Sequence, residues 1–163
     1  ARLAGIFPGA TWPAKRWLKE RFAALAERLC EEEGANIVFF AGPREKGLLD
    51  ELRLLGKCNP LFVEGESIMR VAAVMSMCSV VVSNDAAPMH LAGALGVPVV
   101  GIFGPSDPLV WFPYSGTNGS SAIRKEVNCC GRDVCSEDHR CMKSVEVEEV
   151  FFAARAAMRK AGM

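Results

Sequence analysis

The sequence lacks an excess of charge, a long apolar run and a secretion signal, the features that mark nucleic-acid-binding, membrane-spanning and secreted proteins. Its 163 residues carry no excess charge, because 19 Lys and Arg balance 19 Asp and Glu, so the overall charge does not point to nucleic acid or to an acidic membrane surface. No apolar run approaches the roughly 20 residues that cross a bilayer, and no secretion signal is recognisable. Half of the residues are hydrophobic and 23% are charged. These values favour an ordinary globular domain with a sizeable core.

Cysteine is the residue type that the chain has in excess, with seven. An odd number and the missing export signal argue against a secreted disulfide framework. Three are predicted to be plain buried thiols: Cys30, Cys58 and Cys78. The other four crowd a polar loop at about 128–142: Cys129, Cys130, Cys135 and Cys141. With His139 these four thiols have the chemistry for a tetrahedral zinc site, for one or two disulfides, or for a reduced cluster, and we assign no metal to them.

Apolar runs and helical patterns alternate along the chain. Short apolar runs predict strands at 3–7, 36–41, 61–63, 80–83 and 98–103, and helical periodicity predicts helices at 16–33, 45–55, 67–78, 86–95 and about 144–160. Continuous apolar strands are typical of a parallel sheet that helices cover on both faces. The pattern therefore predicts an α/β fold, a Rossmann-like doubly wound parallel sheet, as a single domain over 1–163. Residues 104–143 are left as one long irregular region.

The first strand is followed by a loop that has the chemistry to bind phosphate. Ligands of open α/β sheets bind beyond the carboxyl ends of the strands. Gly9 permits close approach of the backbone, Thr11 offers a hydroxyl, and Lys15 and Arg16 offer positive charge near a helix start. The alternative is a glycine turn with two solvated cations.

The fourth strand is followed by the segment SNDAAPMH at 83–90. Asp85 is predicted to cap the following helix, and the small side chains of Ala86 and Ala87 would leave neighbouring amides open. Pro88 suits a first-turn position, and His90 would lie near the positive end of the helix dipole. The segment therefore indicates an anion-binding corner, or else a capped structural helix in which His90 packs against the next loop.

The second and fifth strands also end in polar turns. Glu45 follows the second strand, where its carboxylate could accept hydrogen bonds from a ribose. The alternative is an exposed carboxylate that merely suits a helix start. The turn at 103–108 brings Gly, Pro and Asp to the same edge. Four such exits together favour a ligand site more than any one of them alone.

In order along the chain, these motifs resemble those of one known family. They are PGA at 8–10, KRW at 15–17, SNDxxPMHLA at 83–92, GVPVV at 96–100, FGP at 103–105 and CM at 141–142. They resemble the C-terminal half of the bacterial ADP-heptose:lipopolysaccharide heptosyltransferases of glycosyltransferase family 9, particularly the heptosyltransferase II group.

The resemblance implies a GT-B glycosyltransferase, in which two Rossmann-like domains face a cleft. The C-terminal domain of such an enzyme binds ADP-heptose, and the N-terminal domain binds the lipopolysaccharide core acceptor. The family inverts configuration and needs no metal or other cofactor. Its general base lies in the N-terminal domain, which has no counterpart here, so the isolated domain is expected to be inactive. The resemblance also implies a cytoplasmic protein, with peripheral contact at the inner face of the inner membrane.

Carried onto this sequence, the resemblance implies a donor site without catalytic residues of its own. The implied residues are Gly9, Ala10, Thr11, Lys15, Glu45, Asp85, Ala86, Ala87, Pro88, Met89 and His90. Thr11 and Lys15 would contact the pyrophosphate, Glu45 the ribose, and 85–90 the diphosphate-heptose. Where the family often has Ser/Thr-Gly, this chain has Ala86-Ala87, so contacts there would come from backbone amides. Two alternatives are a GT-B transferase for another nucleotide sugar and a non-catalytic nucleotide-binding module.

Overall fold

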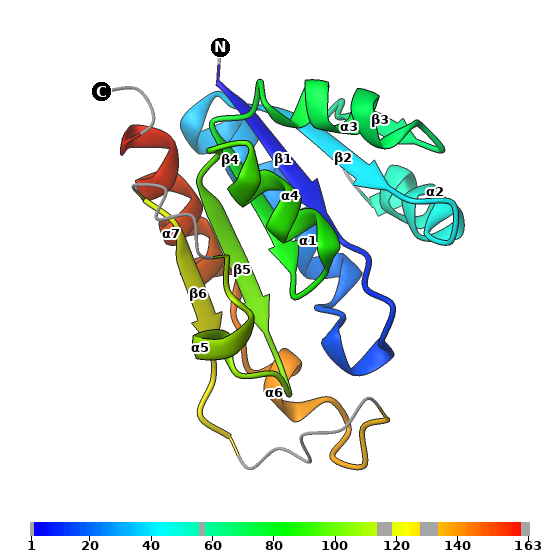
Figure 1. Cartoon of the computed structure of the whole chain (residues 1–163), viewed down its shortest axis with the longest axis vertical. Coiled ribbons are helices and arrows are strands. Elements are labelled where there is room, and N and C mark those ends of the chain that lie inside the picture. Colours follow the sequence, from blue (N-terminus) through cyan, green and yellow to red (C-terminus); the bar gives the residue numbers. More distant parts are fainter. Residues whose placement is uncertain (1, 56–57, 114–118, 128–133, 161–163) are drawn as a thin grey trace.

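A six-stranded sheet, with strand order β3-β2-β1-β4-β5-β6, forms the centre of the computed structural model (Figure 1), which describes residues 2–55, 58–113, 119–127 and 134–160. The strands are β1 (Leu3–Phe7), β2 (Asn36–Ala41), β3 (Leu61–Glu64), β4 (Val80–Asn84), β5 (Val99–Phe103) and β6 (Ser121–Arg124). All neighbouring pairs are parallel; Ile6, for example, pairs with Phe39 on one side and Val82 on the other. The predicted doubly wound, Rossmann-like fold is confirmed, and its strand order reverses between β1 and β4.

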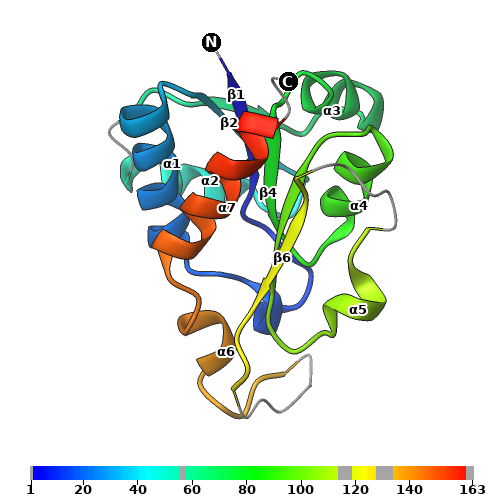
Figure 2. The same ribbon diagram turned by 90° about the vertical axis from the view of Figure 1, so that its left-hand side faces the viewer.

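Helices cover both faces of the sheet. They are α1 (Lys19–Glu33), α2 (Lys46–Leu55), α3 (Ile68–Met75), α4 (Ala87–Ala94), α5 (Pro108–Trp111), α6 (Arg140–Lys143) and α7 (Val147–Lys160), with a 3-10 turn, η1, at Pro13–Lys15. Figure 2 shows α1 and α7 on one side of the sheet and α3 and α4 on the other. Within the described ranges, no helix is both long enough and apolar enough to cross a membrane.

Each face of the sheet has its own hydrophobic core, because successive strand residues point to opposite sides. Ile6 and Val82 pack with Phe22 of α1 and Phe151 of α7. Their chain neighbours face the other way; Val81, for example, packs with α3 and α4. Burial on both faces explains why these strands are continuous apolar runs.

Helix boundaries agree with those predicted to within three residues. Gly34 ends α1 in the left-handed conformation, with φ of 61°, and the Ser67 side chain caps α3 by accepting a bond from the Arg70 amide. The helix predicted from residue 16 begins instead at Lys19, because Arg16 and Leu18 have extended backbones. The last helix starts at Val147 and not at 144.

The region 104–143, predicted as irregular, contains α5, β6 and α6. Strand β6 was missed because it is a short edge strand whose residues alternate between half-buried and exposed. Such a strand does not show the continuous apolar run that marks the buried strands.

Candidate functional site

Asn84, the last residue of β4, fastens the loop that leaves β1. Its side chain is fully buried. The Nδ2 group donates to the carbonyls of Pro8 at 2.9 Å and Gly9 at 3.3 Å, and Oδ1 accepts from the Trp17 amide at 3.0 Å. The amide group is thus occupied on both sides by one loop. Sequence reasoning did not assign Asn84 to the site, although a polar residue that ends a buried apolar strand is a usable signal.

Lys15 and Asp85 bring the exits of β1 and β4 together. The Lys15 Nζ lies 2.6 Å from Asp85 Oδ2, and both side chains are largely buried. The same ammonium lies 4.6 Å from the ring centre of Trp12 and 5.9 Å from that of Trp111, within the range of cation–π attraction. The cation is therefore held by a carboxylate and two indole rings, and the predicted convergence of the two loops is present.

The predicted role of Asp85 as a helix cap is wrong. The N-cap of α4 is Ala86, whose side chain offers no capping group, while the Asp85 carboxylate pairs with Lys15. A charge-assisted bond to a largely buried ammonium outcompetes a bond to a neighbouring amide. As a result, no side chain among the described residues caps the positive end of the α4 dipole.

A cavity of about 340 Å³ lies at this carboxyl edge, beside the ion pair. Six of the predicted site residues line it: Ala10, Thr11, Glu45, Ala86, Ala87 and Pro88. An apolar wall comes from α3 and α4, through Ile68, Val71 and Leu91. Sequence reasoning missed this wall, because apolar residues on amphipathic helices look like ordinary core.

The other predicted residues lie outside the cavity lining. Asp85 directly precedes the lining residue Ala86, so its pair with Lys15 flanks the cavity. Met89 is fully buried and packs into the core beneath Gly101, where a β-carbon would lie 2.8 Å from its sulfur. His90 is exposed on α4, one helical turn beyond Ala87.

Two glycines make room for the side chain of Glu45. A β-carbon at Gly9 would lie 2.5 Å from Glu45 Cγ, and one at Gly42 would lie 2.8 Å from Glu45 Oε2. Such separations are far below van der Waals contact. The close approach that Gly9 was predicted to offer a ligand is therefore used by Glu45, whose carboxylate lies between the exits of β1 and β2.

The cysteine-rich loop lies only partly within the described residues. The Cys135 sulfur accepts hydrogen bonds from the amides of Glu137 at 3.4 Å and His139 at 3.1 Å. Among the residues that the structure describes, no group of three or more His, Cys, Asp or Glu side chains is placed to hold a metal ion. Cys129 and Cys130 lie outside the described residues, so the zinc, disulfide and reduced-cluster hypotheses all remain predictions.

The strand order and the polar corners at its reversal point define a Rossmann-like α/β domain of the class that binds ligands at this edge. The sequence model of glycosyltransferase family 9 (heptosyltransferase) matches residues 1–140, and the chain belongs to that family.

Individual relatives agree with this assignment. The chain is 27% identical to the lipooligosaccharide heptosyltransferase 2 of Campylobacter jejuni, over 97% of this chain and 51% of that protein. It is 36% identical to the lipopolysaccharide heptosyltransferase 2 of Salmonella typhimurium, over 65% of this chain and 32% of that protein. The chain thus spans about half the length of the first of these relatives and about a third of the second.

Solved structures show the same fold. The glycosyl transferase family 9 protein from Veillonella parvula superposes with a TM-score of 0.83 at 25% identity, over 98% of this chain and 47% of that one. The E. coli ADP-heptose lps heptosyltransferase II superposes with a TM-score of 0.80 at 24% identity, over 99% of this chain and 48% of that one. The predicted GT-B type of Rossmann-like domain is therefore confirmed.

Proposed function

We propose that this chain is the donor-binding domain of an inverting glycosyltransferase that transfers L-glycero-D-manno-heptose from ADP-heptose to the lipopolysaccharide inner core. Membership of the heptosyltransferase family supports the reaction class. The observation that carries the proposal is the meeting of Lys15, Thr11 and the uncapped start of α4 beside one cavity.

The cavity suits the parts of a nucleoside diphosphate. The apolar wall of Ile68, Val71 and Leu91 would receive the flat base, and the Glu45 carboxylate would accept hydrogen bonds from ribose hydroxyls. The diphosphate would lie between Thr11 and the start of α4, where the helix dipole and backbone amides favour anions. The Lys15 ammonium stands beside that position.

The chemistry of transfer follows from these charges. Breaking the bond between the anomeric carbon and the phosphate oxygen leaves negative charge on the departing ADP. Lys15 and the start of α4 would stabilise this charge as it develops, which lowers the barrier more than it strengthens ground-state binding. The proton of the acceptor hydroxyl would be taken by a general base outside this chain.

The proposal extends to the rest of the enzyme. The chain would form one domain, including its cysteine-rich loop, and an N-terminal acceptor domain would supply the general base and bind the lipopolysaccharide core. A lipid-linked acceptor would bring the enzyme to the cytoplasmic face of the inner membrane as a peripheral protein. By itself the chain would bind donor without transferring heptose.

Calorimetry on the folded chain tests the donor site directly. We expect ADP and ADP-heptose to bind with a dissociation constant below about 1 mM, which corresponds to about −4 kcal/mol. UDP and GDP serve as matched competitors that differ only in the base. Absence of ADP binding would overturn the proposal, whereas preference for UDP or GDP would favour a transferase for another nucleotide sugar.

A further inference from the structure

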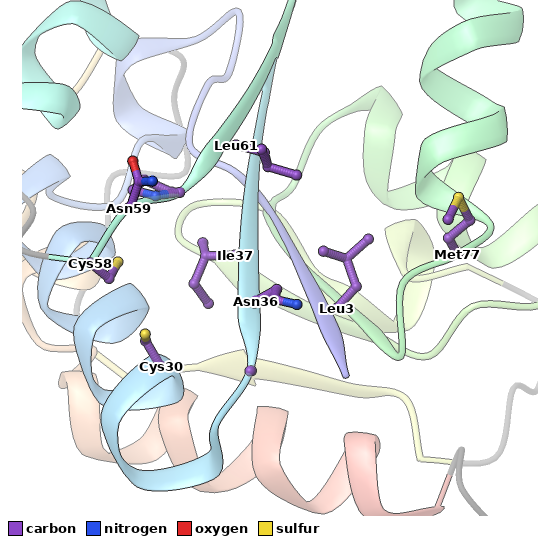
Figure 3. A pocket seen from close by; sticks show the side chains of 10 residues that line it. Leu3, Cys30, Asn36, Ile37, Cys58, Asn59, Leu61 and Met77 are labelled. Carbon is purple, nitrogen blue, oxygen red and sulfur yellow. The ribbon is translucent and has the colours of Figure 1, made fainter. Parts of the chain in front are cut away.

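A second cavity, of about 520 Å³, lies at the opposite edge of the sheet from the proposed donor site. Leu3, Asn36 and Leu61, which are the first residues of β1, β2 and β3, all line it (Figure 3). Two cysteines also line it: Cys30 in the last turn of α1, and Cys58 just ahead of β3. The proposed donor chemistry uses neither thiol.

The two thiols line the same cavity although 28 positions separate them in the chain, and Cys30 adds to the effect of burial in raising the pKa of the Cys58 thiol. Figure 3 shows them on neighbouring segments, α1 and the stretch that leads into β3. Both residues are half-buried and line the cavity, so a small reagent can reach them. Cys78, in contrast, is buried in the core on the other face of the sheet.

We propose that Cys30 and Cys58 form a reversible dithiol–disulfide pair, a modification site that is independent of the proposed donor function. Thiols that line one cavity from neighbouring segments need only a modest approach to reach bonding distance. The oxidant is a low-molecular-weight disulfide of the glutathione class. One cysteine thiolate attacks a sulfur of that disulfide, which forms a mixed disulfide and releases one thiol. The second cysteine then attacks the protein sulfur of the mixed disulfide and releases the other thiol. Two cysteine protons thus end on two glutathione thiols, and the oxidant is reduced as the cysteine pair is oxidised.

Burial raises the pKa of the Cys58 thiol, and the neighbouring Cys30 and Glu27 add smaller contributions in the same direction. Because only the thiolate attacks, this shift slows attack by Cys58 near neutral pH. Closure would fasten the end of α1 to the start of β3 and bracket the β2–α2 segment between them.

Peptide mapping by mass spectrometry tests the pair in the complete 163-residue chain. The chain is incubated with oxidised glutathione, quenched with an alkylating agent and digested. We expect a peptide pair cross-linked through Cys30 and Cys58 that disappears on reduction. ADP binding should be the same before and after oxidation, which separates this site from the proposed donor site.

Single variants test whether each thiol of the pair can react. Cys58→Ser should accumulate one glutathione adduct on Cys30, and Cys30→Ser should accumulate one on Cys58. Cys135→Ser, which removes a thiol of similar exposure, should leave the cross-link unchanged. Glutathione adducts that persist on the wild-type pair without closure would overturn the proposal. So would pairing of either thiol with another cysteine, or failure of both to react when the urea-unfolded chain reacts fully.

Discussion

The side chain of Glu45 lies directly over the α-carbon of Gly9, so that a β-carbon at Gly9 would lie 2.5 Å from Glu45 Cγ. Gly42 also lacks a side chain that would clash with the Glu45 carboxylate. Two glycines, one after β1 and one after β2, thereby set where this negative charge lies. In the proposed function that position determines the contact with the ribose.

Gly9→Ala should therefore weaken ADP binding by displacing Glu45. The added methyl group cannot fit without moving the carboxylate, so we expect the dissociation constant to rise about tenfold, as for the loss of one hydrogen bond to a charged group. Calorimetry measures the change. Gly47→Ala is the matched control, because no atom of the described, non-adjacent residues lies within 4 Å of a β-carbon there. Equal affinities of both variants would show that the placement of Glu45 does not matter for ADP.

Lys15→Met should raise the dissociation constant for ADP about 10- to 100-fold, because it would remove the proposed charge-assisted phosphate contact. The same change leaves the buried Asp85 carboxylate unpaired, so it should also destabilise the fold. The double variant Lys15→Met/Asp85→Asn should recover stability in urea unfolding without recovering ADP affinity. Recovery of both would mean that Lys15 acts only through the ion pair.

A test of the role of Lys15 in catalysis requires the full-length enzyme. If Lys15 stabilises the departing diphosphate, Lys15→Met should lower kcat by a larger factor than it raises the donor dissociation constant. Lys19→Met is a suitable control, because that ammonium pairs with Glu51 on the exposed side of α1 and α2. Equal losses in kcat and in donor affinity would show that Lys15 only binds the donor and does not stabilise the transition state.

Asn84→Ala should destabilise the domain by about 2–4 kcal/mol. The variant leaves the Trp17 amide and the carbonyls of Pro8 and Gly9 without their buried partner. Urea unfolding followed by circular dichroism gives the free energy. Ser83→Ala, next to it in β4, removes a single bond to the Asn84 carbonyl and should cost only about 1 kcal/mol. Equal costs would contradict the fastening role of Asn84.

Cys78 should make the stability of the fold depend on pH at alkaline values. Burial raises the pKa of its thiol from 9.0 to about 12. Between these values the unfolded chain loses the thiol proton and the folded chain keeps it, so the free energy of unfolding falls as pH rises. The contribution is at most about 1.4 kcal/mol per pH unit. Cys78→Ala should show a shallower decline between pH 9 and 10.5, and identical slopes would refute the assignment.

The sequence was informative where burial and local pattern agree. Strands such as Val80–Asn84 are buried on both sides and stand out as apolar runs, whereas the edge strand Ser121–Arg124 has no such run. The cap of Ser67 is a contact within one turn, so it could be predicted. The partner of Asp85 lies 70 positions away, and no local rule identifies it.

Some residues of the proposed donor site could be predicted from the sequence, and others could not. Thr11, Glu45 and Ala86 follow strand ends, and topology brings such positions to one edge. Met89 was grouped with them by motif, yet it shares a helix face with Ala92 and packs with it in the core. The apolar wall at Ile68 and Val71 could not be foreseen, because the helix pattern does not say which exposed face borders a cavity.

The bond between Lys15 and Asp85 also bears on how a spent nucleotide would leave. The Asp85 carboxylate would compete with a bound diphosphate for the Lys15 ammonium. When the diphosphate leaves, the ion pair between Lys15 and Asp85 would form again. In the empty site the charge of Lys15 is therefore neutralised by Asp85, so the departure of the nucleotide leaves no unpaired buried charge. We expect this built-in competitor to limit how tightly ADP is held and so to shorten its stay.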